Sequence, residues 1–177
     1  YNLQIYTFAL MKFIKTILIF FILSSCVSEE KSNVELEFYR FDHHFSEINE
    51  NNYDVKLYEI EKFLPDFVDY YLNNHIGMFI ENDNMKKSNI LSFTSFEDVV
   101  LLQNKINKNF PDVTEINEKF NKAFSKYLSF FPKKEMPNKV ITINSFGSNG
   151  VDVLGNNIIV GLDFYIGDEN PMYISVY

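Results

Sequence analysis

The three histidines are the residues whose side chains could bind a metal ion. His43 and His44 are adjacent, whereas His75 lies far along the chain. If the adjacent pair lies on a strand, its side chains point to opposite faces and cannot easily share one ion. The chain contains no His-Glu-x-x-His motif. We therefore expect ordinary surface or capping roles for these histidines, and no metal or other cofactor.

Several carboxylates could act in pairs as the acid and base of a hydrolase. Asp152, Asp163 and the pair Asp168–Glu169 lie near expected turns. Turns favour Asp because its side chain hydrogen-bonds to nearby backbone groups, so a structural role is a sufficient explanation. The chain also offers no evident Ser/His/Asp or Cys/His constellation. The residues by themselves thus point to no catalytic site.

Cys26 is the only cysteine, and the residues before it predict that it is acylated. Lys12 and Lys15 begin a segment that continues as an apolar run and ends at Leu23-Ser24-Ser25. A basic start, an apolar core and small residues describe a secretory signal. A cysteine directly after the small residues resembles a bacterial lipobox, which implies cleavage before Cys26 and acylation of its thiol and new amino terminus. The mature chain would then be held at a membrane by lipid.

An uncleaved membrane anchor is the alternative interpretation of this segment. The apolar core has about 10–14 residues, and a spanning helix needs roughly 20. Phe8 to Met11 could lengthen the core into a span. We favour the lipoprotein because the lysines and the small residues lie on the correct sides of the apolar core.

The sequence divides into four parts. Residues 1–10 contain no Met and no charge, and we expect them to lie upstream of a true start at Met11. Residues 11–25 form the signal peptide, residues 26–33 a polar tether, and residues 34–177 a single domain. The expected location is the cell envelope, on a periplasmic or surface-exposed face.

The composition excludes two classes of protein. Hydrophobic residues make up 46% of the chain, which is too many for a wholly disordered protein. The formal net charge is −8. Nucleic acids bind to Lys and Arg, so an acidic chain argues against a nucleic-acid partner, and also against docking on anionic lipid by charge.

Hydrophobic periodicity predicts an α+β fold, with a short strand, about four helices and then a small sheet. The first strand covers the alternating residues Val34 to Phe41. The first two expected helices cover residues 51–64 and the residues after Pro65 up to Gly77. The third begins with a capping box at Thr94–Glu97 and continues to Phe110, and the fourth contains the apolar stripe Ile116–Phe131. Residues 81–89 are expected to form a loop.

The last part of the chain changes to the two-residue period of strands. Strands are expected at residues 140–146, 151–154 and 158–162, joined by tight turns into an antiparallel β-meander. The strand at 158–162 has almost no polar alternation, which indicates burial on both of its faces. We expect the meander to lie against the Ile116–Phe131 stripe.

Five motifs follow the lipobox in a fixed order. They are Arg40-Phe41-Asp42 with Phe45, the run Phe63 to Phe67, the run Asn109 to Asp112, Phe130-Phe131-Pro132, and the run Ile158 to Gly167. Together they resemble the gliding-motility lipoprotein family GldB of Bacteroidetes over essentially the whole mature chain. The resemblance implies a non-enzymatic envelope protein that works with other gliding or secretion machinery proteins. Family members continue beyond the position of Tyr177, so we expect this chain to be an N-terminal portion.

A fragment of a zincin-like metallopeptidase is the alternative. In that fold a strand borders the cleft and the next long helix bears His-Glu-x-x-His, which would lie beyond the end of this sequence. Asn144, Phe146 and Asp163 would then line a degenerate groove that binds peptide by strand addition. With Arg40 and Asp42 of the first motif, they are the candidate partner-binding residues. A third option is an acidic lipoprotein that only scaffolds its neighbours.

Overall fold

The computed structural model describes residues 34–167. The expected signal peptide, Cys26, the tether and the pair Asp168–Glu169 lie outside the described residues. The described part is α+β, as predicted. Its elements are β1 (Glu37–Tyr39), α2 (Phe41–Ser46), α3 (Tyr53–Phe63), α4 (Phe67–Tyr70), the π-helix η1 (Tyr71–Ile76), α5 (Asp83–Ser95), α6 (Glu97–Asn109), α7 (Thr114–Phe130), β2 (Lys139–Ile143), β3 (Val151–Leu154), β4 (Asn157–Gly161) and the 3-10 helix η2 (Leu162–Tyr165).

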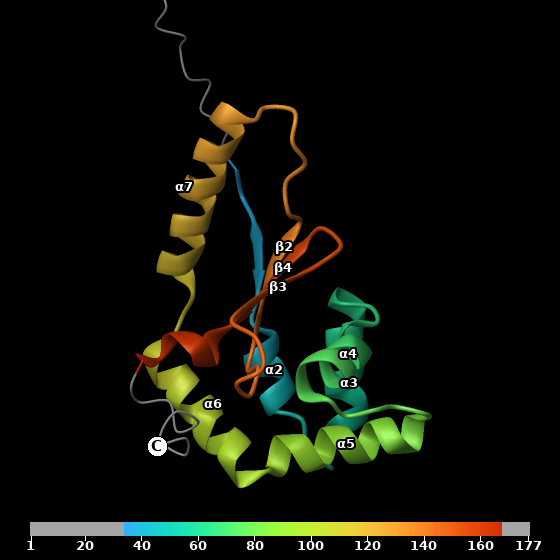
Figure 1. Ribbon diagram of the computed structural model, residues 1–177. Helices are drawn as coiled ribbons and strands as arrows, with labels where there is room; N and C mark the ends of the chain where they lie inside the picture. Colours follow the sequence, from blue (N-terminus) through green and yellow to red (C-terminus); the bar gives the residue numbers. More distant parts are fainter. Residues whose placement is uncertain (1–33, 168–177) are drawn as a thin grey trace, which may run out of the picture.

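The four strands form one mixed sheet in the order β1-β2-β4-β3 (Figure 1). β1 pairs with β2 and β2 with β4 in parallel, and only β3 and β4 form an antiparallel pair. The predicted antiparallel meander is therefore wrong outside this hairpin. After β2 the chain first forms the edge strand β3 and then returns as β4 to the inner position. An inner position suits β4 because its residues are apolar on both faces.

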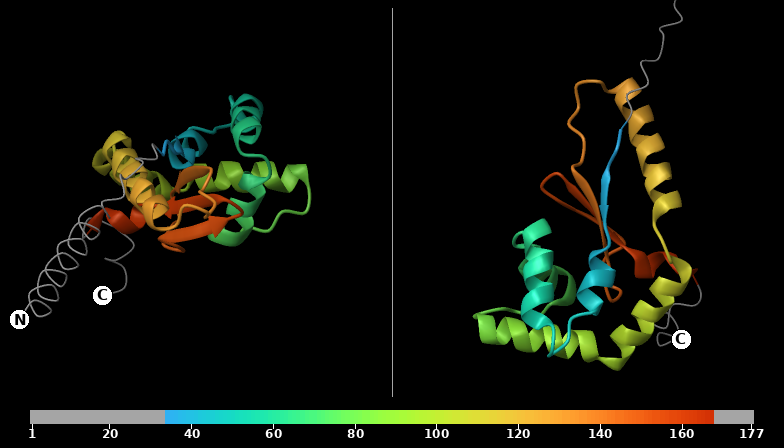
Figure 2. Two further views of the ribbon diagram at one scale, coloured as in Figure 1. Left: turned by 90° about the horizontal axis from the view of Figure 1, so that it is seen from above. Right: turned by 180° about the vertical axis from the view of Figure 1, so that it is seen from behind.

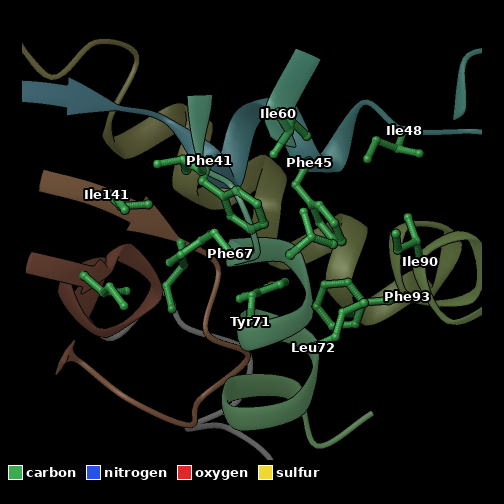
Figure 3. Close-up of a cluster of buried hydrophobic side chains, with 14 of the residues drawn as sticks. Phe41, Phe45, Ile48, Ile60, Phe67, Tyr71, Leu72, Ile90, Phe93 and Ile141 are labelled. Atoms are coloured by element: carbon green, nitrogen blue, oxygen red, sulfur yellow. The ribbon is translucent and has the colours of Figure 1, made fainter. Parts of the chain in front are cut away.

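Each face of the sheet has its own apolar core. On one face Ile141 and Ile159 lie with the aromatic side chains of α2, α4 and η1 (Figure 3). On the other face Val140 and Val160 lie with residues of α6. The predicted burial of both faces of β4 is thus confirmed. Full burial of each large apolar side chain stabilises the fold by about 1.5–3 kcal/mol, and the fully buried ones include Phe41, Tyr71, Ile60, Leu102 and Ile106.

The residues after β1 form a helix, although the sequence suggested a strand. Arg40 separates β1 from α2, and His43 and His44 both lie on α2. The centroids of their rings are 5.8 Å apart. The expected strand geometry, with the two side chains on opposite faces, is therefore wrong. Residues 34–167 nevertheless contain no group of three or more His, Cys, Asp or Glu side chains that could hold a metal ion.

The expected loop at residues 81–89 is largely helical. Asn82 precedes α5, and its side-chain oxygen accepts a hydrogen bond from the backbone amide of Met85 at 3.0 Å. The predicted capping box is also wrong, because Thr94 lies in the last turn of α5 and α6 begins at Glu97 after the extended residue Phe96. Asn82 is the N-cap that the polar composition of this segment concealed.

The helix expected after the proline is present as α4 and η1. It ends at Gly77, whose φ of 74° lies in the left-handed region that glycine adopts readily. The predicted stop at this residue is confirmed. The widened π-helical turn in η1 was not expected, and such turns are frequent at functional sites.

The long helix α7 stands beside β1 and does not cross the sheet (Figures 1 and 2). Phe120 contacts Phe38 of β1 edge-to-face, with ring centroids 5.5 Å apart. None of the residues of α7 is fully buried. The expected packing of the stripe on the sheet is present only in part, because α6 covers the inner strands on this face.

Candidate functional site

The five candidate residues from the sequence follow the carboxyl ends of the three parallel strands. Arg40 and Asp42 follow β1, Asn144 and Phe146 follow β2, and Asp163 follows β4. In open sheets with parallel strands, this edge is where ligands usually bind. The structure therefore brings residues that are far apart in sequence to one edge of the sheet.

Asp42 is the centre of a buried polar network at this edge. Its Oδ1 accepts a hydrogen bond from Arg40 Nε at 2.9 Å, and its Oδ2 accepts one from Arg40 Nη2 at 2.7 Å. Thr142 Oγ1 donates to Oδ1 at 2.5 Å, and Gln103 Nε2 donates to Oδ2 at 3.0 Å. Arg40 Nη1 also donates to the carbonyl of Phe110 at 2.7 Å. The network thus joins β1, α2, α6 and β2.

These contacts decide the charge of Asp42. Burial raises the pKa of its carboxyl, but the hydrogen bonds and positive charge of Arg40, with the bonds from Thr142 and Gln103, outweigh burial and leave the pKa below its ordinary value. Asp42 is therefore ionised at neutral pH. A buried charge of this kind is tolerated because it is paired and fully hydrogen-bonded.

Asn144 extends the network beyond the end of β2. Its Nδ2 donates to Gln103 Oε1 at 3.3 Å, and its carbonyl accepts a hydrogen bond from the hydroxyl of Tyr71 at 2.6 Å. Its Oδ1 accepts a hydrogen bond from the backbone amide of Phe146 at 3.2 Å. Burial raises the pKa of Tyr71 well above its ordinary value, so the hydroxyl remains a donor.

Asp163 holds the loop that leaves β2. Its carboxylate accepts hydrogen bonds from the backbone amide of Ser145 at 2.8 Å, from the Ser145 hydroxyl at 2.8 Å and from the amide of Gly147 at 2.9 Å. Between these donors Phe146 has a φ of 49°, a left-handed conformation that is uncommon for a bulky residue. The three hydrogen bonds help to maintain this strained turn.

Gly161 at the end of β4 has to be glycine for a steric reason. A Cβ atom there would overlap the carbonyl oxygen of Asn149 in the same loop. The backbone amide of Gly161 donates to the carbonyl of Gly150 at 2.9 Å. The loop after β2 is therefore held against β4 by close backbone contact as well as by Asp163.

This network leaves almost no space for a ligand. A cavity of about 10 Å³ is lined by Asp42, Tyr71, Gln103, Asn144 and apolar neighbours. One water molecule needs about 10–15 Å³. Asp42, Asn144 and Asp163 are 2%, 3% and 0% exposed. Within residues 34–167, these polar side chains at the carboxyl edge are thus enclosed by the protein, and their hydrogen bonds position the ends of the strands.

The zincin-like interpretation is not confirmed by this arrangement. Asn144 follows β2 and Asp163 follows β4, and both strands are inner strands of the sheet. A peptide that adds a strand needs a free edge, which only β1 and β3 could offer here. The expected groove around these residues is therefore occupied by the protein itself.

A second polar cluster, which no motif predicted, lies between β3 and the consecutive helices α4 and η1. Tyr70 donates a hydrogen bond from its hydroxyl to Asp152 Oδ2 at 2.6 Å, which raises the pKa of Tyr70 to about 12. His75 Nε2 lies 3.5 Å from the same oxygen, and neither ring nitrogen has a hydrogen-bond partner. Burial lowers the pKa of His75, although the nearby charges of Asp152 and Asp163 oppose the change. His75 is therefore a buried neutral imidazole at neutral pH.

An open groove of about 620 Å³ lies between β1 and α3. The ring of Tyr39 stacks on Phe63 with a centroid distance of 5.6 Å, and it contacts His44 at 5.1 Å. Val55 and Tyr58 on α3 are 63% and 69% exposed. Lys56, Glu59 and Lys62 also line the groove, so an apolar surface has charged groups beside it. A depression of similar size, about 650 Å³, is lined by residues 46–50 and by residues of α5. The aromatic side chains distinguish the groove between β1 and α3 from that more polar depression.

The comparisons with known proteins agree with the motifs in the sequence. The model of the family described as gliding motility protein GldB matches residues 25–177. Neither the curated proteins nor the solved structures gave a match. Within residues 34–167, no helix has both the length and the apolar character needed to cross a membrane. Because the family model covers most of its length, the chain belongs to the GldB family of gliding motility proteins.

Proposed function

We propose that this chain is a non-enzymatic, lipid-anchored envelope protein that binds another protein of the gliding machinery through the groove between β1 and α3. Membership of the gliding motility family supports the role in gliding. The closed carboxyl edge of the sheet supports binding over catalysis. The open aromatic groove supports this site for the partner.

The hydrogen bonds of the buried network support binding over catalysis. Arg40, Asp42, Gln103 and Asn144 direct their polar atoms toward one another, with a cavity of about 10 Å³ between them. A catalytic site needs room for substrate beside its acid, base or nucleophile. In this arrangement, the same groups serve to fix the ends of the strands.

The groove has the composition of a protein-binding surface. Tyr39, Tyr58 and Phe63 provide aromatic area, which is enriched in the centres of protein interfaces. Phe63 is 52% exposed, so much of its apolar surface is in contact with water in the free protein. A partner that covered this ring would remove that surface from water. Lys56, Glu59 and Lys62 can make polar contacts at the rim. A partner segment with apolar side chains between charged ones would match this pattern.

Lipid attachment at Cys26 would place this groove near a membrane. The order of lysines, apolar run, small residues and cysteine supports acylation. The tether of residues 26–33 would then separate the lipid from the domain. The acidic composition argues against a nucleic-acid partner.

Substitutions in α3 test the groove directly. Cells that carry Val55→Ala with Tyr58→Ala should lose gliding, because both exposed side chains would no longer reach a partner. Both changes keep the helix and affect exposed positions, so the protein level should be unchanged. The matched control is Phe79→Ala, which removes a side chain that is 69% exposed outside the groove. Normal gliding of the double variant at normal protein level would overturn the proposed partner site.

A further inference from the structure

The start of the described chain is attached to α7 by two hydrogen bonds. The backbone amide of Leu36 donates to Asn121 Oδ1 at 2.8 Å, and that of Val34 donates to Ser125 Oγ at 3.4 Å. Two residues of extended chain span about 6.6 Å, and four residues of helix span about 6 Å. The matching spans show that this segment and α7 run side by side in opposite directions, as Figure 1 also shows.

This antiparallel arrangement fixes the direction in which the chain enters the domain. Moving from Leu36 back to Val34 corresponds to moving from Asn121 forward to Ser125 on α7. At Val34 the chain therefore points toward the carboxyl end of α7. Cys26 precedes Val34 by eight residues, which can span at most about 28 Å. Phe131 lies about 9 Å beyond Ser125 along the helix direction.

The end of α7 exposes aromatic side chains. The rings of Phe120, Phe124, Tyr127 and Phe131 form a continuous series along the helix, with successive centroids 6.2, 6.3 and 5.0 Å apart. The series begins against the sheet at Phe38 and ends in solvent. Phe130 is 67% exposed and Phe131 is 51% exposed. Two adjacent exposed phenylalanines at the end of a helix are unfavourable in water alone.

The charge around these rings is opposite to that of the whole protein. From Lys122 to Lys134 the chain contains four lysines and no carboxylate, whereas the formal net charge of the chain is −8. Lys126, Lys133 and Lys134 are all exposed. Aromatic rings flanked by lysines are typical of segments that enter the headgroup region of a bilayer. Long lysine side chains there can extend toward the lipid phosphates.

We propose that the end of α7, residues 126–134, contacts the surface of the membrane in which the lipid on Cys26 is inserted. This inference rests on the proposed lipid anchor, because the direction of the chain from Leu36 to Val34 and the eight-residue separation of Cys26 from Val34 favour this end of the domain facing the bilayer. Phe130 and Phe131 enter the headgroup region, and the three exposed lysines lie near the phosphates. The contact orients the domain with α7 directed at the membrane and the α5 end away from it.

A single tryptophan can report this contact, because the chain contains no tryptophan of its own. The full acylated chain with Phe131→Trp is placed in phosphatidylethanolamine–phosphatidylglycerol vesicles, with and without lipid that is brominated near the headgroup. Indole rings prefer this depth in a bilayer, and we expect the brominated lipid to reduce the emission by about twofold or more. Phe79→Trp in the segment between η1 and α5 is the matched control, and its emission should not change.

Flotation of the same vesicles separates the anchor from the contact. If the chain floats with the vesicles but the Phe131→Trp emission equals that of the Phe79→Trp control, the contact of α7 is overturned and the anchor stands. If the acylated chain does not float, both are overturned, because the contact depends on the anchor. Quenching of Phe131→Trp in floated vesicles, with none for Phe79→Trp, supports the proposed orientation.

Discussion

Arg40 and Asp42 face each other just beyond β1 and form two hydrogen bonds, at 2.9 and 2.7 Å. The side chain of Asp42 has no exposed surface, and that of Arg40 is 15% exposed. Removal of either partner would leave the other without its counter-charge in an environment with little water. The pair therefore makes the junction of β1 and α2 sensitive to single substitutions and to pH.

Substitution of Arg40 should lower stability strongly. Arg40→Met keeps much of the aliphatic side chain but leaves the Asp42 carboxylate buried without its counter-charge, so we expect a loss of about 3–5 kcal/mol in the free energy of unfolding. Urea unfolding measures this change. Lys119→Met is the control, because the Lys119–Glu115 pair is highly exposed and should contribute little to the free energy of unfolding. A variant of Arg40 as stable as the wild type would show that the pair is not important for folding.

Asp42 should make the protein sensitive to acid. Its burial raises the pKa, but Arg40, Thr142 and Gln103 lower it to a value below that of the unfolded chain. The stability that Asp42 contributes is therefore complete above the unfolded pKa of about 4 and is lost as the pH falls through the lower folded pKa. As the pH is lowered through this range, the free energy of unfolding should fall less steeply for Asp42→Asn than for the wild type. Parallel curves for the two proteins would contradict this assignment.

His75 should give a second dependence on pH in a higher range. Burial lowers its folded pKa, with partial opposition from Asp152 and Asp163. Between this value and the unfolded pKa of about 6.5, only the unfolded state binds the proton, so stability should fall as the pH drops below about 6.5. NMR titration of the His75 ring gives the folded pKa, and His75→Gln should remove this part of the pH dependence. A folded pKa above about 6.5 would show that Asp152 dominates.

Acylation should require Cys26. Cells supplied with a clickable palmitate should label the wild-type protein and not Cys26→Ala, because the chain has no other thiol. Fractionation should place the wild type with membranes and the variant with the soluble fraction. Equal labelling of the two proteins would refute acylation at this residue.

Local patterns in the sequence predicted the helices whose apolar residues recur clearly. The helices around Ile60, Ile106 and Phe120 lie where this periodicity places them. α5 was missed because Asn82 acts as its cap within a stretch of polar residues. The parallel pairing of β1 with β2 could not be predicted, since it joins residues that are far apart in sequence and leaves no local pattern.

The candidate site was predictable only in part for the same reason. The first motif indicated Arg40 and Asp42, and the zincin-like alternative indicated Asn144; the structure joins the three through one hydrogen-bond network. Gln103 appeared to be an ordinary polar residue of a helix, yet its amide joins Asp42 to Asn144. His75 and Asp152 meet only because η1 lies beside β3. Whether the residues at the edge of the sheet influence partner binding remains a prediction.

The order of the strands has a consequence for how the chain folds as it emerges. Among the strands of residues 34–167, β4 comes last in sequence but lies between β2 and β3, so the centre of this sheet is not complete until residue 161 is available. β1 must wait for a partner about a hundred residues later, and such distant pairings form slowly. Until then β2 exposes apolar residues on both faces. A chain delivered from its amino terminus should therefore need protection from aggregation until β4 has arrived.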